Sequence, residues 1–394
     1  MKKISIFSGP LIGAAFLMAT SAIGPGFITQ TTLFTEQLKA SFGFVILISL
    51  LLDIGAQVNL WRLITVSKHY AQDLANRVAP GAGYVLTTLI LLGGFAFNAG
   101  NIAGAGLGFE VLFGWRPQQG AIVSCIIAIV VFLIKDTGKA LDWFSKVLGV
   151  LMITLTLFVV FQSGPPMAEA ITKTFLPDKI DELVILTIVG GTVGGYISFS
   201  GAHRLLDAGI TGQENIGKVS KSSVSGIVIT SIMRWILFLA ALGVVWKGIP
   251  LGNKNPGAVV FESAAGMLGY KLFGLVLWSA AITSVVGSAF TSVSFAKSLH
   301  PFFERNFRGL IIAFILISAA LFFIAGTPLK VLVAAGAING LVLPIALAII
   351  LCSSWRKDIL GTYKHPLWMS VAGWIVVFAM LYMAARGIMI FVDS

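Results

Sequence analysis

The feature that most constrains this chain is a series of long apolar stretches with few or no charges. The stretch 272–296, for example, contains no Asp, Glu, Lys or Arg. A helix rises about 1.5 Å per residue, so about 20 such residues cross the hydrocarbon core of a bilayer. We therefore predict an all-α polytopic membrane protein. Its eleven expected spans are 11–39, 43–65, 83–113, 120–134, 143–162, 183–207, 223–246, 272–296, 307–325, 330–352 and 367–391.

Composition excludes several other classes of protein. Hydrophobic residues make up 57% of the chain and charged residues 11%, with a mean hydropathy of +0.95, which no soluble core could bury. Two cysteines are too few for a disulfide scaffold, and no basic run is long enough to follow a nucleic-acid backbone. Ser198 and His203 lie close in sequence but lack the acid and the nucleophile elbow of a hydrolase. We expect neither an enzyme nor a cofactor.

The net charge of +11 orients the chain rather than indicating a polyanionic partner. Cytoplasmic loops of membrane proteins are enriched in Lys and Arg. With the N-terminus inside, loops such as 297–308 and 356–364 face the cytoplasm and help to place most Lys and Arg there. We expect a multi-pass protein of the cytoplasmic (inner) membrane, surrounded by lipid, with its C-terminus outside. Residues 2–22 imitate a secretory signal, but the apolar character continues to Leu38, which favours one long first span.

Glycine and proline interrupt two of the spans. Gly-Pro-Gly-Phe occupies 24–27 in the first span, and Gly-Gly-Thr-Val-Gly-Gly-Tyr occupies 190–196 in the sixth. Proline lacks a backbone donor and glycine has low helix propensity, so each segment is predicted to unwind near the middle of the membrane. Unwound backbone survives there only where it lines a cavity enclosed by protein. The alternative is that these glycines simply allow neighbouring helices to pack closely.

The positions of the two breaks indicate an internal repeat. Each falls in the first helix of one half of the chain, which is the pattern of inverted-repeat transporters. We predict a single transporter domain over 1–394, with a first repeat at about 8–163, a second, inverted repeat at about 180–353 and an extra helix at about 366–391. A channel would be expected to show charged rings or a repeated carbonyl filter, and neither is visible.

Two segments resemble a known family. The run Asn-Ala-Gly-Asn-Ile-Ala-Gly-Ala at 98–105, with Leu-Phe-Gly at 112–114, is similar to the Asp-Leu-Ala-Glu-x-x-Gly-x-Ala…Leu-Phe-Gly segment of the NRAMP divalent metal transporters. The tenth span, with Asn339 and Leu-Pro at 343–344, and the segment 358–374 resemble the family's last two helices. The resemblance covers most of the chain. It implies a divergent NRAMP member with a LeuT-like fold of five plus five inverted helices, broken helices 1 and 6, and an eleventh helix.

The sequence departs from the family where the family's chemistry lies. Gly-Pro-Gly-Phe at 24–27 stands in place of the metal-binding Asp-Pro-Gly-Asn, and 194–197 in place of Met-Pro-His-Asn. Asn98 and Asn101 match an Asp and a Glu that resemble a proton relay, and amides cannot titrate. The glutamine expected in the tenth span is also absent. The resemblance therefore implies a transporter whose usual metal ligands are missing.

The residues at the breaks favour a small organic substrate. A dehydrated dication needs strong oxygen, nitrogen or sulfur ligands, whereas amides at half-helix N-termini favour an anionic group such as a carboxylate. We expect an amino-acid-like solute or an organic acid, for example pyroglutamate, moved by alternating access. The alternative is a divalent metal ion (Mn, Fe or Mg) with non-standard ligands. The candidate substrate site comprises Gly24, Pro25, Gly26, Phe27, Thr29, Gln30, Asn98, Asn101, Gly194, Gly195, Tyr196, Ser198 and Asn339.

Asp53, Gln57 and His203 are the candidates for coupling to H⁺ or Na⁺ in symport. Asp53 lies inside the second span, where a carboxylate is a functional candidate, and Gln57 at i+4 shares its face. The alternative is that Asp53 bonds to a scaffold hydroxyl or to Arg234. An unperturbed histidine titrates near neutrality, which makes His203 a candidate; the alternative is that His203, with Arg204 and Asp207, caps the cytoplasmic end of the sixth span. Before the eighth span, 259–268 is predicted to form a short amphipathic helix at the membrane interface.

Overall fold

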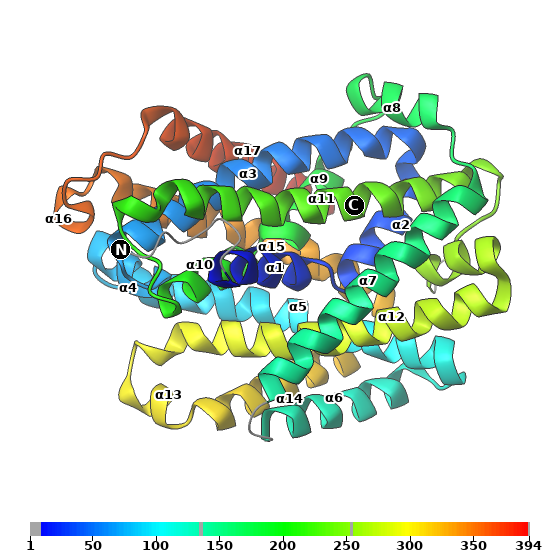
Figure 1. Cartoon of the computed structure of the whole chain (residues 1–394), viewed down its shortest axis with the longest axis horizontal. Helices are drawn as coiled ribbons and strands as arrows, with labels where there is room; N and C mark the ends of the chain where they lie inside the picture. Colours follow the sequence, from blue (N-terminus) through cyan, green and yellow to red (C-terminus); the bar gives the residue numbers. More distant parts are fainter. Residues whose placement is uncertain (1–8, 134–136, 253–254, 393–394) are drawn as a thin grey trace.

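The computed structural model describes residues 9–133, 137–252 and 255–392, which fold almost entirely into α-helices (Figure 1). Within these residues, each of the eleven predicted spans falls on a helix or on a pair of helices; residue 134, the last of the fourth predicted span, lies outside them. The long helices are α1 (Gly9–Ala22), α2 (Pro25–Leu38), α3 (Phe42–Ser67), α5 (Ala82–Phe113), α6 (Pro117–Leu133), α7 (Thr137–Ser163), α9 (Glu182–Val193), α10 (Ile197–Asp207), α11 (Ile216–Trp246), α12 (Pro256–Lys297), α14 (Phe307–Ala325), α15 (Pro328–Leu351) and α17 (Leu367–Val392).

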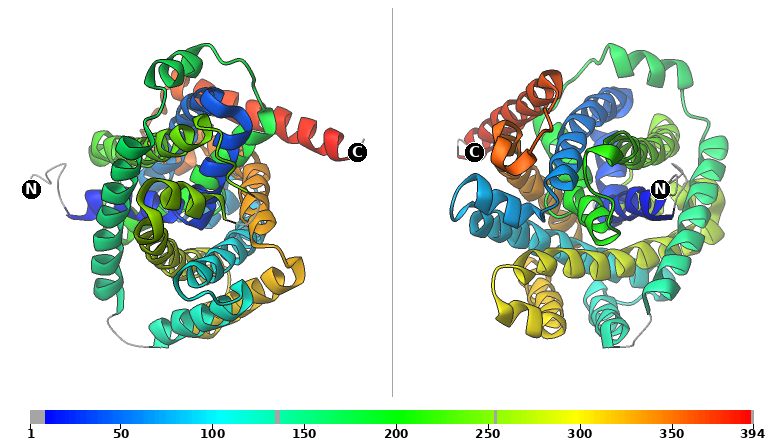
Figure 2. Two further views of the ribbon diagram at one scale, coloured as in Figure 1. Left: turned by 90° about the vertical axis from the view of Figure 1, so that its right-hand side faces the viewer. Right: turned by 60° about the vertical axis from the view of Figure 1, so that its left-hand side comes forward.

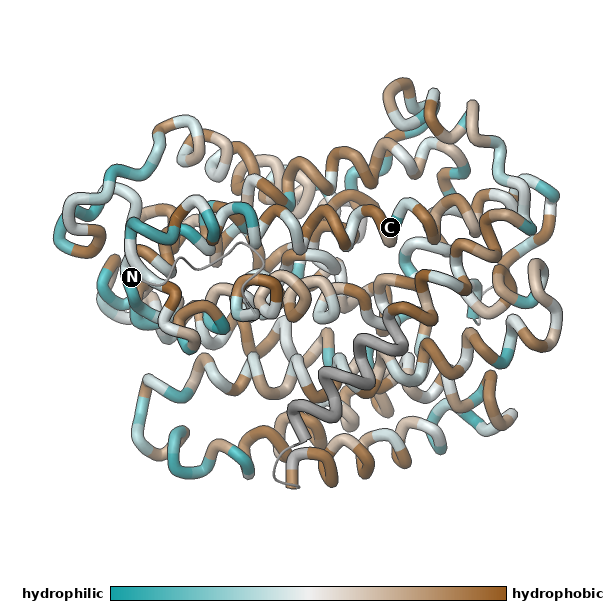
Figure 3. The backbone as a smooth tube through the Cα atoms, in the orientation of Figure 1, coloured by the Kyte–Doolittle hydropathy of each residue, from teal (hydrophilic) through white to brown (hydrophobic). Residues whose placement is uncertain are grey.

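Short helices join these spans at the two ends of the bundle. They are α4 (Ala71–Val78), α8 (Met167–Phe175), α13 (Pro301–Arg305) and α16 (Lys357–Leu360), with single 3-10 turns at Lys39–Ser41, Gln213–Asn215 and Cys352–Trp355. Figure 1 shows α4, α13 and α16 at one end and α8 at the other. In Figure 3 hydrophilic residues gather toward these ends and hydrophobic ones between them, as expected for a bundle that crosses a membrane along its long axis.

The broken helices occupy the inside of the bundle. In the right-hand view of Figure 2, α1, α9 and α10 are surrounded by the other helices. In the most apolar part of 182–207, 94% of the residues are buried inside the protein, against 33% in α14. The sixth span therefore faces protein, and α14 largely faces outward. α5 packs against α12 and α15, which in turn packs against α9. Small residues allow these close approaches: a Cβ added to Gly108 of α5 would lie 2.7 Å from Trp278 Cβ of α12.

The short helix predicted at 259–268 is present as the first part of α12, which begins at Pro256 and is separated from the eighth span by a kink at Gly266, where φ is 58°. Val260 and Phe261 are buried, and a Cβ on Gly257 would lie 3.1 Å from Ile28 Cγ2. This segment therefore packs over α2 through its apolar side chains.

Candidate functional site

The first break separates α1 from α2. α1 ends at Ala22 and α2 begins at Pro25, so only Ile23 and Gly24 are non-helical. Pro25 and Gly26, which were predicted to be unwound, form the first turn of α2 instead. Proline is well suited to that position, because the first turn of a helix leaves its N–H groups without intrahelical partners. The first turn of α2 carries no acidic residue, so its positive dipole end has no anionic cap within the helix.

The second break is also shorter than predicted. α9 continues through Gly190 and Gly191 to Val193, and the turn is formed by 194–196. A Cβ on Gly190 would lie 2.0 Å from Gly336 O of α15, so the first two glycines serve close helix packing. Only Gly195 has a positive φ, 55°. The Ser198 hydroxyl donates to the Val193 carbonyl across the break, which satisfies backbone freed by the interruption.

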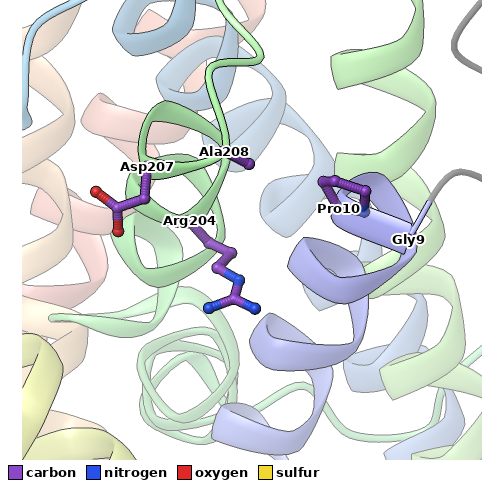
Figure 4. A pocket seen from close by; sticks show the side chains of 5 residues that line it. All are labelled: Gly9, Pro10, Arg204, Asp207 and Ala208. Carbon is purple, nitrogen blue, oxygen red and sulfur yellow. The ribbon is translucent and has the colours of Figure 1, made fainter.

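The two broken helices lie antiparallel to each other. At one end, Gln37 Nε2 near the end of α2 donates to Asp181 Oδ2 before α9, at 3.1 Å. At the other end, Figure 4 shows Arg204, Asp207 and Ala208 at the end of α10 across from Gly9 and Pro10 at the start of α1, around a pocket of about 420 Å³. Both breaks therefore lie between the same two ends of the bundle.

Asparagine and serine side chains surround the first break. A Cβ on Gly24 would lie 3.2 Å from Ser284 Oγ of α12 and 3.3 Å from Asn101 Oδ1 of α5. One turn earlier on α5, Asn98 Oδ1 accepts a hydrogen bond from Ser288 Oγ at 2.8 Å. The structure thus brings the two predicted amides together near Gly24, with serines of α12 that the sequence analysis did not single out.

Gln30 and Asn339 connect the broken helices to α15. Gln30 Nε2 of α2 donates to Leu332 O at 2.9 Å, and its Oε1 would lie 2.7 Å from a Cβ on Gly191. Asn339 Nδ2 donates to Gly93 O at 3.0 Å and to Ala335 O at 2.8 Å, while its Oδ1 faces the second break. Thr29 is buried beside Gln30. The Tyr196 ring lies edge-on to Phe97, with ring centroids 5.7 Å apart.

Many buried polar atoms of this region have no hydrogen-bond partner within the described chain. Buried polar groups of native proteins are nearly always paired with protein, water or ligand. Their concentration near the two breaks therefore indicates a place where a solute or water completes the bonding. The side-chain atoms are Gln30 Oε1, Asn98 Nδ2, Asn101 Nδ2, Ser284 Oγ, Ser292 Oγ and Asn339 Oδ1.

Arg234 of α11 is a site residue that the sequence analysis missed. Its guanidinium lies over the Phe27 ring, 4.3 Å from the centroid, and Nη1 donates to Thr192 Oγ1 at 2.8 Å. It therefore bridges the first turn of α2 and the last turn of α9, next to both breaks. The available signal was its position as the lone charge within 223–246, since an intramembrane arginine is a functional candidate by default.

Asp53 and Gln57 of α3 are both buried, as their shared face predicted. Gln57 Nε2 donates to Ser223 O of α11 at 3.1 Å. Asp53 Oδ1 has no hydrogen-bond partner, and Arg234 acts on the carboxylate electrostatically rather than through a hydrogen bond. The alternative, in which Asp53 bonds to a scaffold hydroxyl or to Arg234, is thus not realised through Oδ1, because no donor reaches that oxygen.

A cavity of about 860 Å³ runs from the first break to the end of the bundle that holds α4 and α13. Ser21 and Ser284 line its inner end, and Lys297 and Glu304 line its outer end. His203 also lines it, and its Nε2 accepts a hydrogen bond from Ala71 N at 3.2 Å. His203 therefore anchors the start of α4 beside the cavity.

Tyr70 adds a second contact between α4 and α10. Its hydroxyl donates to the Asp207 carboxylate, and its ring lies edge-on to His203 with centroids 5.0 Å apart. Burial, followed by this hydrogen bond, raises the pKa of Tyr70 to about 12, so the hydroxyl keeps its proton at physiological pH. The wall of the cavity mouth is consequently tied to the C-terminal half of the broken sixth span.

No group of three or more His, Cys, Asp or Glu side chains able to hold a metal ion occurs among the described residues. The polar groups at the breaks are neutral amides and hydroxyls plus one guanidinium. Such a set suits hydrogen bonding to an organic or anionic solute better than replacement of the hydration shell of a dication.

Two interrupted antiparallel helices around a buried polar site are the arrangement of a secondary transporter. The family model for natural resistance-associated macrophage protein-like (Nramp) proteins matches residues 15–390. The chain therefore belongs to the Nramp family, and it is a multi-pass membrane transporter rather than an enzyme.

Relatives and solved structures agree with this assignment. The chain is 57% identical to the membrane protein YcsG of Bacillus subtilis over 373 residues, covering 95% of this chain and 92% of that protein. It is 22% identical to the divalent metal cation transporter MntH of Pectobacterium carotovorum over 388 residues, covering 93% and 91%.

The solved structures establish the LeuT-like fold. A mutant of the Eremococcus coleocola manganese transporter superposes with a TM-score of 0.76 at 15% identity, covering 98% of this chain and 88% of that one. MhsT in complex with L-phenylalanine superposes with a TM-score of 0.71 at 18% identity, covering 94% and 97%.

Proposed function

We propose that this transporter carries a small organic solute, amino-acid-like or an organic acid, across the cytoplasmic membrane in symport with H⁺ or Na⁺. One observation carries the proposal. The groups that flank the two breaks are neutral amides, hydroxyls and the guanidinium of Arg234, several of them without partners. An organic molecule with an anionic group satisfies donors and acceptors of this kind, and the glycines at the breaks leave it room.

An inverted repeat of the two halves of the chain would allow the site to open to each side of the membrane in turn. α4 joins the second and third spans of the first half, and the Pro256 segment of α12 joins the second and third spans of the second half. They lie at opposite ends of the bundle (Figure 1), as inversion requires. The basic loops 297–308 and 356–364 lie at the end that holds α4. We assign that end to the cytoplasm, which makes this the inward-open state.

The fold of MhsT supports an organic substrate, because that structure holds L-phenylalanine. A divalent metal ion is the second candidate. It is favoured by the names of the MntH relatives and of the manganese transporter. Gln30 Oε1 and Asn339 Oδ1 are neutral oxygens that a metal ion could use, and the buried carboxylate of Asp53 on α3 is an anionic group.

A thermal-shift experiment on the detergent-purified protein separates the two candidates. The ligands are Mn²⁺, Mg²⁺, a panel of amino acids and small organic acids. A ligand that binds only the folded state raises the apparent stability, by about 2.7 kcal/mol at a hundredfold excess over Kd. We expect stabilisation by a member of the organic panel. Stabilisation by a dication alone, lost in Asp53→Asn, would establish metal transport instead.

A further inference from the structure

We propose that Arg234 binds a carboxylate group of the transported solute, and that Asp53 takes up one proton as this carboxylate binds. The inference rests on the proposed function and adds to it a substrate class, the monocarboxylates, and a coupling ion, H⁺. Arg234 is 2% exposed and Asp53 is 1% exposed, so both charges are held away from solvent in the interior of the bundle.

One edge of the Arg234 guanidinium is free. Nη1 is used by Thr192, and the ring of Phe27 covers one face, but Nε and Nη2 have no partner within the described chain. In an arginine–carboxylate pair, these two nitrogens can donate two parallel hydrogen bonds to the two carboxylate oxygens. Arg356, in a loop of the same chain, shows the geometry: its Nε and Nη2 donate to the two oxygens of Asp358, each at 2.9 Å.

The position of Arg234 joins this edge to the transport path. Phe27 lies three residues beyond Gly24, which faces Ser284 at the inner end of the large cavity. Thr192 lies two residues before the second break. A solute that enters the cavity and reaches the breaks would therefore meet the guanidinium after passing Gly24. Because Arg234 does not line the cavity in this state, binding also requires movement of the first turn of α2.

The charge balance of the site leads to the proton step. Without solute, the Asp53 carboxylate and the Arg234 guanidinium sum to zero. A bound monocarboxylate adds one negative charge, and an uncompensated charge is costly in a buried site. When the solute carboxylate pairs with Arg234, one H⁺ from solution joins Asp53–COO⁻ to give Asp53–COOH. The loaded site is neutral again, and each cycle moves one anion with one proton.

Arg234 is the charged group that acts on Asp53 in the described chain, and Asp53 the one that acts on Arg234. Six charged or titratable side chains on or next to the other helices packed against α3 have partners elsewhere. They are Glu36 with Leu251 N, Asp73 with Ser298, Glu169 with Lys173, Glu182 with Arg386, His203 with Ala71 N, and Arg356 with Asp358. Besides burial, the charge that acts on Asp53 is therefore that of Arg234 and of whatever Arg234 binds.

Calorimetry of the purified full-length protein tests the proposal. The probes are acetate, lactate and pyroglutamate, each compared with its carboxamide. Titrations in two buffers of different ionisation enthalpy measure the protons taken up per molecule bound. We expect at least one acid to bind, its amide to bind roughly tenfold or more weakly, and about one proton to be taken up near pH 7. Asp53→Asn should bind the acid with no proton uptake.

Variants of the arginine complete the test. Arg234→Lys keeps the positive charge but loses the paired Nε and Nη2 donors, and Arg234→Gln loses both the charge and the paired donors. Acid binding should weaken roughly tenfold or more in each variant. Arg356→Gln, which removes the same geometry from a loop, is the control and should bind as the parent does. If Arg234→Gln fails to fold, the charge-balanced double variant Asp53→Asn with Arg234→Gln replaces it.

The outcomes separate this inference from the proposed function. If no acid binds, or if acid binding and proton uptake survive in the Arg234 variants, the inference is overturned. Organic transport would still stand if proteoliposomes accumulate a solute that lacks a carboxylate. Conversely, an acid that binds with one proton but is not accumulated would support the site and contradict the transport proposal.

Discussion

Asn339 Oδ1 occupies the space that a side chain on Gly195 would need: a Cβ built there would lie 1.9 Å from that oxygen. Gly195 also has φ at 55°, a left-handed conformation that costs other residues energy. The second break is thus shaped by the contact between α15 and the turn 194–196, while Asn339 is itself held by hydrogen bonds to Gly93 O and Ala335 O.

Gly195→Ala should destabilise the protein by about 3 kcal/mol, from left-handed strain and overpacking together. Gly209→Ala is the matched control, because Gly209 has φ at 70° but no atom within 4 Å of the added Cβ. It should cost only about 1 kcal/mol. Thermal unfolding in detergent measures both. Equal losses in the two variants would show that Asn339 gives way and that the contact does not shape the break.

Gly24→Val should leave the fold intact and weaken substrate binding roughly tenfold or more, because its side chain would meet Ser284 and Asn101 at the first break. Gly287→Val places the same side chain on α12 at a point with no atom within 4 Å. It lines the cavity away from the break and should bind normally. Thermal shift with the stabilising ligand compares the two variants. If the Gly24 variant binds the ligand as the parent does, the substrate site does not lie at the first break.

The sequence predicted the spans well because a bilayer imposes both length and composition on each helix. It also located both breaks, since proline and glycine act locally. It overestimated their extent. Gly190 and Gly191 remain helical and pack closely, Gly190 against Gly336 and Gly340 of α15 and Gly191 against Gln30 of α2, and no local pattern reveals these contacts.

Arg234 shows the same limit at the site. The sequence placed it inside a span, but its partners Phe27 and Thr192 belong to two other helices. Only tertiary packing brings the three together. The candidate residues at the breaks could be chosen from the broken spans, whereas the charge that completes the site could not be assigned to it without the fold.

Cysteines introduced into the cavity should report the open side. In a background with Cys352→Ser, Thr283→Cys and Gly287→Cys should react within minutes with a membrane-impermeant thiol reagent applied from the cytoplasmic side. Phe27→Cys, at a position that is 1% exposed and outside the cavity lining, should react slowly. The native Cys125 is buried and sets the background. Labelling from the external side alone would reverse the assigned orientation.

His365 should make stability depend on pH below neutrality. Burial, followed by the field of Arg62, lowers its pKa from 6.5 to about 4. Tyr363 Oη lies 3.1 Å from Nδ1 and Asn59 Oδ1 lies 2.7 Å from Nε2. The unfolded chain therefore binds more protons between pH 6.5 and 4, and stability falls as pH decreases through that window.

Because the His365 ring is partly exposed, solvent screening reduces this effect to on the order of 1 kcal/mol. Thermal unfolding at pH 7 and pH 5 should show the loss in the parent protein. His365→Gln, which does not titrate, should show a smaller difference between the two values of pH. An identical pH response in both proteins would mean that another group is responsible.

Uptake by proteoliposomes tests the central claim most directly. The purified protein is reconstituted and supplied with radiolabelled pyroglutamate, lactate, L-amino acids or Mn²⁺, with and without an inwardly directed proton gradient. The account predicts that at least one organic solute accumulates, that the proton gradient increases its uptake, and that Gly24→Val abolishes it. Accumulation of Mn²⁺ with no uptake of any organic solute would contradict the account.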